Sequence, residues 1–171
     1  ECVYEYDEDG NQTGVYVEYD GGTVENLKNA YNYIGQLTEV KDERNNKVLA
    51  EYTYDNAGNL VQKKGDGQKT LYSYNESNQL ETISNMSLAN EESGAYGCYS
   101  RYSYEYSLDG SRVKETDIVG NTTEYSYDKA GRLTKENVTE GVNTSWMEYT
   151  YDARGNRVSK YTSADDITVD Y

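Results

Sequence analysis

One heptad sets the architecture expected of this chain: Tyr54-Asp55-Asn56-Ala57-Gly58-Asn59-Leu60, which returns as Tyr127-Asp128-Lys129-Ala130-Gly131-Arg132-Leu133. An aspartate that opens a four-residue turn can accept hydrogen bonds from the backbone amides that follow it. A glycine at the fourth position supplies the positive φ of a hairpin with a bulge. The heptad therefore predicts a β-hairpin in which Tyr54 faces Leu60, Tyr52 faces Gln62, and Tyr52, Tyr54 and Leu60 share one face. The same register predicts two further pairs, Tyr74 with Leu80 and Tyr127 with Leu133.

The pattern recurs along the chain as a Tyr-x-Tyr pair followed by a turn. The pairs are Tyr4/Tyr6, Tyr31/Tyr33, Tyr52/Tyr54, Tyr72/Tyr74, Tyr104/Tyr106, Tyr125/Tyr127 and Tyr149/Tyr151. Successive second tyrosines lie 20 to 32 residues apart, which leaves room for two short strands and two turns in each repeat. We therefore predict an all-β fold, in which tandem antiparallel hairpins stack into one curved, twisted sheet.

Departures from the heptad are compatible with the same turn. Asn75 and Ser107 replace the aspartate, and both are expected to make the same local hydrogen bond. Asn78 replaces the glycine and is the residue type that best tolerates positive φ after glycine. The copy Tyr33-Ile34-Gly35-Gln36-Leu37 is two residues short, so its hairpin should differ. Leu37 should still lie on the tyrosine face. Side chains alternate between the two faces of a strand, so the loss of two residues leaves this alternation unchanged.

The two longest spacings predict insertions near 13–30 and 84–100 in a single array of about seven repeats over 1–171. A short helix is the minor alternative to a strand at Thr23–Tyr33. Met86–Gly94 is predicted to be a mobile loop.

Composition excludes several classes of protein. The net charge of -15, from 16 basic and 31 acidic residues, argues against nucleic acids and anionic membrane surfaces as partners. No apolar stretch is long enough to span a bilayer. Leu, Ile, Val and Phe make up only about 15% of the chain, a share typical of disorder. The 21 tyrosines offset this, since each buries a ring while keeping a polar hydroxyl.

No catalytic, cofactor-binding or metal-binding residue is predicted, so the chain is not expected to be an enzyme. It has no histidine, the usual general base and metal ligand. Asp165/Asp166 is read as a solvated loop rather than an acid–base pair. In Asp7-Glu8-Asp9-Gly10-Asn11 the glycine comes two positions too early for an EF-hand, so a hairpin turn is favoured. A cation ladder along Asp7, Asp55, Asp128 and Asp152 is the less favoured reading.

Three other features leave alternatives open. Cys2 and Cys98 could form a disulfide or remain free thiols. The sequons at Asn11, Asn75, Asn85, Asn121, Asn137 and Asn143 are read as incidental. Trp146 and the tyrosines could stack on sugars, although a structural ladder explains their period more simply.

The repeated Tyr-x-Tyr-[Asp/Asn/Ser]-x-x-[Gly/Asn] pattern, from about Tyr4 to Tyr161, resembles the YD repeats of the RHS (rearrangement hotspot) family. Bacterial wall-associated proteins, toxin complexes and animal teneurins carry similar repeats. The resemblance implies a β-sheet that spirals into a hollow shell able to enclose a toxic domain, in a secreted or cell-surface protein. The proline-containing motif that usually closes the RHS core is absent, because the chain has no proline. The chain therefore resembles an interior fragment of such a protein.

This resemblance implies a structural or encapsulating role whose partners are the rest of the parent protein and its toxin cargo. A carbohydrate-binding adhesion module is the alternative. The strand-like ends, Tyr4-Glu5-Tyr6 and Ile167-Thr168-Val169-Asp170-Tyr171, carry no proline or lysine. They therefore predict self-association through open sheet edges.

Overall fold

The computed structural model describes residues 1–90 and 93–171, and every regular element in these ranges is a β-strand. The strands are hydrogen bonded in chain order across the sheet. They are β1 (Cys2–Tyr6), β2 (Gln12–Tyr19), β3 (Gly22–Tyr31), β4 (Leu37–Asp42), β5 (Lys47–Tyr54), β6 (Leu60–Gly65), β7 (Gln68–Tyr74), β8 (Leu80–Asn90), β9 (Ala95–Tyr106), β10 (Arg112–Asp117), β11 (Thr122–Tyr127), β12 (Leu133–Glu140), β13 (Asn143–Tyr151), β14 (Arg157–Thr162) and β15 (Ile167–Asp170). The predicted all-β hairpin fold is confirmed.

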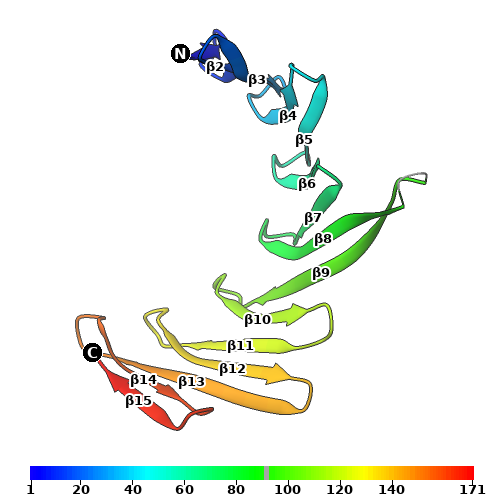
Figure 1. The fold of residues 1–171 in the computed structure, drawn as a ribbon. Coiled ribbons are helices and arrows are strands. Elements are labelled where there is room, and N and C mark those ends of the chain that lie inside the picture. The colour runs from blue at the N-terminus through cyan, green and yellow to red at the C-terminus, as the bar shows by residue number, and fades with distance from the viewer. Residues whose placement is uncertain (91–92) are drawn as a thin grey trace. The chain divides into compact units, whose positions relative to one another are not determined.

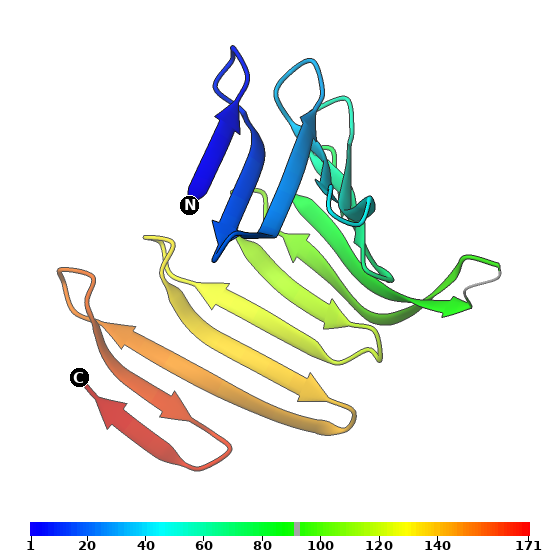
Figure 2. The same ribbon diagram turned by 45° about the horizontal axis from the view of Figure 1, so that its top comes forward.

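The chain divides into two compact units, Glu1–Tyr72 with Asn85–Cys98 and Ser73–Ser84 with Tyr99–Tyr171. In the first unit, β1 to β6 form three successive hairpins (Figure 2). In the second, β10 to β15 lie side by side in chain order (Figure 1). Each odd-numbered strand up to β13 leads through a tyrosine turn into the next strand. The tyrosine turns are 7–11, 32–36, 55–59, 75–79, 107–111, 128–132 and 152–156.

Six hairpins closed by a tyrosine turn carry a β-bulge just beyond the turn. Tyr54 pairs with Leu60 as predicted, but Thr53 pairs with Gln62, so Val61 is an extra residue. The same shift is seen in the hairpins β1–β2, β3–β4, β9–β10, β11–β12 and β13–β14. The predicted pairing of Tyr52 with Gln62 is therefore wrong: Tyr52 faces Lys63, because the bulge advances the second strand by one residue.

The second repeat needs a larger correction, because it has lost no residues. Tyr31 pairs with Leu37, and the turn runs from Asn32 to Gln36. Asn32 takes the place of the aspartate, and Gly35, at φ +77, takes the place of the turn glycine. Tyr33 is a turn residue with 97% of its surface exposed, rather than the second member of a Tyr-x-Tyr pair.

The regions expected to be irregular belong largely to strands. Residues 13–30 lie mainly in β2 and β3, so the helical alternative at Thr23–Tyr33 is wrong. Residues 84–100 lie mainly in β8 and β9, and the first part of the predicted mobile loop, from Met86 to Asn90, completes β8. Glu91 and Glu92, also in that loop, lie outside the described residues.

The sheet has little conventional core. Among residues 1–90 and 93–171, Tyr149 is the one buried apolar side chain, with 7% of its surface exposed. Asp42 is more deeply buried, at 4% exposure, and its carboxylate accepts hydrogen bonds from Arg44 Nε at 3.1 Å and Nη2 at 2.8 Å. This pairing compensates the buried charge. In the part of the chain described there is no helix with the length and apolar character needed to cross a membrane.

Gly65 lies at a close approach between β5 and β6. A Cβ atom there would lie 2.1 Å from the carbonyl oxygen of Leu49 and 3.2 Å from Cα of Ala50. Real side chains do not tolerate such a contact with backbone atoms. The position therefore requires glycine, as close backbone approaches within sheets commonly do.

Candidate functional site

The tyrosine turns share one hydrogen-bonding plan, which is clearest at Asp55. Its Oδ1 accepts the backbone amides of Ala57 at 2.9 Å and Asn59 at 2.8 Å, and its Oδ2 accepts the side-chain amide of Asn59 at 3.0 Å. The Gly58 amide donates to the Asp55 carbonyl at 3.1 Å. The same plan occurs at Asp7, Asp128 and Asp152, and also at Asp117, which ends β10 and opens a turn that is not a tyrosine turn.

These bonds stabilise the ionised form of the turn carboxylates. The side-chain amide of Asn59 holds the pKa of Asp55 below its ordinary value of 3.8, helped by backbone amides. Asn11 and Asn156 lower the pKa of Asp7 and Asp152 in the same way. The carboxylates are therefore bonded within their own turns, so Asp7-Glu8-Asp9-Gly10-Asn11 is a hairpin turn.

Three tyrosine turns lack the aspartate: Asn32 and Asn75 replace it in two of them, and the third, which begins at Ser107, corrects a prediction. Asn75 Oδ1 accepts the amides of Ser77 at 3.0 Å and Gln79 at 2.9 Å, as expected. Ser107 does not take the aspartate role: its hydroxyl lies 3.0 Å from the carbonyl oxygen of Ser111. Asp109 replaces it, because its Oδ1 accepts the Ser111 amide at 3.1 Å.

The turn glycines adopt the left-handed backbone that the sequence predicts. Gly58 and Gly131 have φ values of +91 and +76, and Asn78 occupies the equivalent position at +63. Gly131→Val should lower the free energy of unfolding by about 1–3 kcal/mol, since a β-branched residue is strained there. Nothing lies within 4 Å of a Cβ at this site, so the effect comes from the backbone alone. Gly131→Asn should be tolerated, and an equal loss for both variants in urea titrations would contradict the assignment.

Five tyrosines that directly precede a tyrosine turn form a ladder between hairpins. Each hydroxyl donates to the carbonyl of the first residue after the preceding tyrosine turn. The bonds are Tyr31 to Gln12 at 2.8 Å, Tyr54 to Leu37 at 2.8 Å, Tyr106 to Leu80 at 2.7 Å, Tyr127 to Arg112 at 2.8 Å and Tyr151 to Leu133 at 2.7 Å. We call these five residues the ladder tyrosines. They are half-buried, so the hydroxyls satisfy backbone carbonyls at the junction of consecutive hairpins.

Tyr149, the first tyrosine of its pair, is held differently. Its hydroxyl donates to Glu136 Oε1 at 2.8 Å, and the guanidinium of Arg157 lies 4.2 Å from the centre of its ring. Burial, followed by the bond to Glu136, raises its pKa from 10.0 to about 12. Burial also raises the pKa of Tyr54, Tyr104 and Tyr125.

These shifts predict a loss of stability in alkali. The unfolded chain ionises its tyrosines near 10.0, while folded Tyr149 holds its proton to about 12. Its contribution is therefore complete below pH 10 and is lost as the pH rises toward 12. The midpoint temperature of thermal unfolding should fall as the pH is raised through this range. The fall should be shallower in Tyr149→Phe, and a fall of the same slope would show that Tyr149 does not carry the effect.

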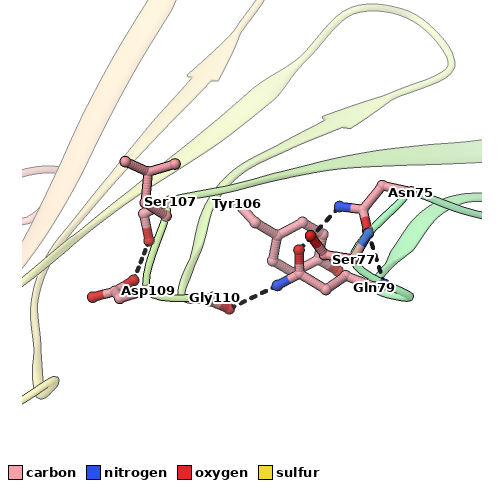
Figure 3. Close-up of a pocket in the computed structure, with 8 residues that line it drawn as sticks. Asn75, Ser77, Gln79, Tyr106, Ser107, Asp109 and Gly110 are labelled. Carbon is pink, nitrogen blue, oxygen red and sulfur yellow. Dashed lines mark hydrogen bonds between the residues drawn. The ribbon is translucent and has the colours of Figure 1, made fainter.

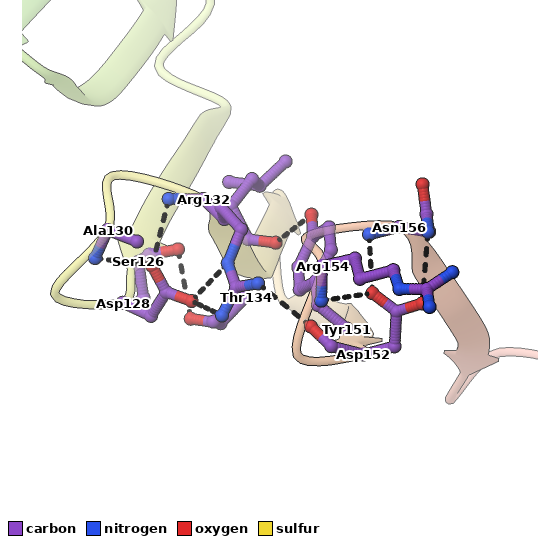
Figure 4. Close-up of polar contacts among 10 residues, drawn as sticks. Ser126, Asp128, Ala130, Arg132, Thr134, Tyr151, Asp152, Arg154 and Asn156 are labelled. Carbon is purple, nitrogen blue, oxygen red and sulfur yellow. Dashed lines mark hydrogen bonds and ion pairs between the residues drawn. The ribbon is translucent and has the colours of Figure 1, made fainter.

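The last residue of most tyrosine turns bonds within its own turn, and the longer side chains at this position also reach the next turn. Gln79 Nε2 donates to the Gly110 carbonyl at 3.3 Å (Figure 3), and Gln36 Nε2 donates to the Gly58 carbonyl at 2.9 Å. Arg132 Nη1 donates to the Asp152 carbonyl at 3.3 Å (Figure 4). We call Gln36, Gln79 and Arg132 the clamp residues. The shorter Asn11, Asn59 and Asn156 bond to the aspartates of their own turns.

Hollows lie beside two of the clamps. One, of about 380 Å³, lies between turns 75–79 and 107–111 and is lined by Tyr106 and Asp109 (Figure 3). The other, of about 360 Å³, lies between turns 32–36 and 55–59 and is lined by Tyr54 and Asp55. Neither lining includes a lysine or an arginine.

The remaining candidates from the sequence do not gather into one site. Asp166 lies in the turn before β15 and accepts the Tyr161 hydroxyl at 3.2 Å. Cys2 and Cys98 are not joined in a disulfide. Trp146 is 37% exposed, and Lys135 Nζ lies 5.3 Å from the centre of its ring. Residues 1–90 and 93–171 hold no group of three or more acidic or cysteine side chains that could bind a metal ion.

Sequence reasoning missed the clamp residues and the acceptors of the ladder. A signal for the clamps was available, because the position after the turn glycine alternates between long and short side chains. The ladder acceptors are backbone carbonyls, and no residue type marks them.

The chain also matches a known protein family over almost its whole length. The family model described as the teneurin YD-shell matches residues 2–171. The chain belongs to the teneurin YD-shell family. The resemblance to YD repeats predicted from the sequence is thereby confirmed.

Curated relatives of this YD-shell chain are much longer proteins. The tRNA nuclease WapA of Bacillus subtilis (strain 168) is 28% identical over 159 residues, an alignment that covers 84% of this chain and 6% of the relative. The tRNA3(Ser)-specific nuclease WapA of Bacillus spizizenii matches with the same identity and coverage.

Solved structures share the YD-shell fold. TcdB2-TccC3 without its hypervariable C-terminal region has a TM-score of 0.76 at 17% identity, covering 99% of this chain and 9% of that chain. The TcdB2-TccC3-Cdc42 structure has a TM-score of 0.68 at 14% identity, covering 99% and 10%. At these identities the likeness concerns the fold alone.

Proposed function

We propose that this YD-shell chain is a structural wall segment, one array of about seven repeats, and not an enzyme. The observation that carries the proposal is the ladder, in which five tyrosine hydroxyls each join a hairpin to the one before it. The five tyrosines that make such a bond directly precede a tyrosine turn. Such an array gains stability from contacts between adjacent repeats, as repeat proteins do.

The parent protein is proposed to be a secreted or cell-surface protein whose shell encloses a toxin or effector domain. Two facts support this: the curated relatives are nucleases of which the chain spans 6%, and the fold matches that of TcdB2-TccC3 without its hypervariable C-terminal region. The partners of the segment would then be the rest of the shell and the enclosed domain. The strands β1 and β15, each paired on one side, would also allow self-association at high concentration.

The enclosing role can be tested in the full-length protein that contains this segment. Tyr127→Phe with Tyr151→Phe removes two hydroxyls of the ladder while keeping both rings. We expect the enclosed domain to become sensitive to protease in this variant. Tyr33→Phe is the matched control, because Tyr33 is 97% exposed and outside the ladder. A domain that is digested equally in the parent, the variant and the control would contradict the proposal.

Carbohydrate binding is the alternative that the exposed aromatic side chains support, chiefly Tyr33 and Tyr19 at 97% and 77% exposure. A glycan array separates the two functions. The wall segment should show no selective binding, whereas an adhesion module should bind a group of related sugars selectively. That binding should be lost in Tyr33→Ala.

A further inference from the structure

Arg132 shows how two successive tyrosine turns hold a guanidinium group (Figure 4). Its Nε and Nη2 both lie 2.7 Å from Asp128 Oδ2, and its Nη1 lies 3.3 Å from the Asp152 carbonyl oxygen. The guanidinium carbon lies 4.8 Å from the centre of the Tyr151 ring. A carboxylate, a carbonyl and the face of a ladder tyrosine therefore surround one planar cation.

The other two clamped turn pairs lack this cation. Gln79 and Gln36 occupy the position of Arg132, and their side chains pair with Asn75 and Asn32 where Arg132 pairs with Asp128. These neutral pairs leave the two hollows of about 380 and 360 Å³.

Each hollow still has groups that attract a cation, although its carboxylate belongs to the following turn rather than to the preceding one. Its lining includes a ladder tyrosine, Tyr106 or Tyr54, and a carboxylate, Asp109 or Asp55. Among the described residues no cation lies over either ring, and neither carboxylate forms an ion pair. By contrast, Tyr151 already has Arg132 over its ring, so this turn pair satisfies itself.

We propose that these two hollows bind guanidinium groups, supplied by arginine side chains of a basic partner segment. A guanidinium is planar, stacks on aromatic faces and is more weakly hydrated than an ammonium, so it should bind better than a lysine side chain. The net charge of -15 would attract such a segment over the distances that salt leaves unscreened. Each hollow lies within one compact unit, so the two sites should fill independently.

The proposal can be tested by NMR titration of the chain with N-acetyl-arginine amide at low ionic strength. N-acetyl-lysine amide and glucose are the comparison ligands. The backbone amides of Gly58 and Gly110 should shift saturably with the arginine compound, less with the lysine compound and not with glucose. Equal shifts with both cations would overturn guanidinium recognition, and shifts with glucose alone would favour a sugar site.

Exchanging the clamp residues tests the location. Asn75→Asp with Gln79→Arg copies the Asp128–Arg132 pair into the first hollow, so the Gly110 shift should disappear while the Gly58 shift remains. Arg132→Gln should open a third hollow and add a shift at Gly155. Arg154→Gln is the matched control. Arg154 is exposed in the turn that contains Gly155, and its substitution should add no shift there.

Shifts at Gly110 that survive the double substitution would overturn the site. The preference for arginine over lysine is measured on the unsubstituted chain, so a variant that fails to fold cannot conceal a negative result.

Discussion

Tyr149→Ala should lower the free energy of unfolding by about 3–5 kcal/mol, the range for truncating a buried aromatic residue. Tyr149 is 7% exposed, and among the described residues it is the one buried apolar side chain. The substitution removes the ring under Arg157 and the hydroxyl bonded to Glu136. The effect should be seen as a lower midpoint in urea at neutral pH.

Two controls separate the effect of losing the ring from that of losing the hydroxyl and from that of any substitution within a strand. Tyr149→Phe keeps the ring and should cost about 1 kcal/mol, the usual net worth of one hydrogen bond. Ser126→Ala, at an exposed position between Tyr125 and Tyr127, should change stability by less than about 0.5 kcal/mol. If Tyr149→Ala cost no more than Tyr149→Phe, the ring would not be contributing as a core residue.

Gly65→Val should lower the free energy of unfolding by about 3 kcal/mol, at the upper end of the range for overpacking. A Cβ at this site would lie 2.1 Å from the Leu49 carbonyl oxygen, so β5 and β6 would have to separate. The collision involves backbone rather than the end of a flexible side chain, so rotamer changes cannot relieve it.

Gly97 in β9 provides the matched control. A Cβ there would meet Ala89 Cβ at 3.7 Å, an ordinary van der Waals contact. Gly97→Ala should therefore be neutral or slightly stabilising, because alanine has less backbone freedom to lose than glycine. Comparable losses for the Gly65 and Gly97 variants in the same titration would show that the contact with Leu49 relaxes easily.

The turns could be predicted from sequence because their chemistry is local. Asp55, Gly58 and Asn59 lie within five residues and determine one another's conformation. The bulge at Val61 could not be predicted in this way. It depends on how β5 and β6 pair over their length, and the extra residue is an ordinary strand residue. Simple counting outward from the turn therefore fails one residue beyond Leu60.

The second repeat was misread because tyrosine spacing was given more weight than turn chemistry. Asn32 and Gly35 stand in the same relation as Asp55 and Gly58, which would have placed Tyr31 next to the turn. The functional surfaces were harder still to predict. The clamps and the ladder join residues about 15 to 30 positions apart, and those contacts depend on how successive hairpins are placed.

The direction of the ladder has a consequence for biosynthesis. Every ladder hydroxyl bonds to a carbonyl earlier in the chain: Tyr54 to Leu37, Tyr127 to Arg112, Tyr151 to Leu133. A ribosome or a secretion channel that releases the amino-terminal end first therefore presents each new hairpin to a partner that has already emerged. Because each repeat closes on its predecessor, folding can keep pace with emergence, and the chain need not wait for distant segments.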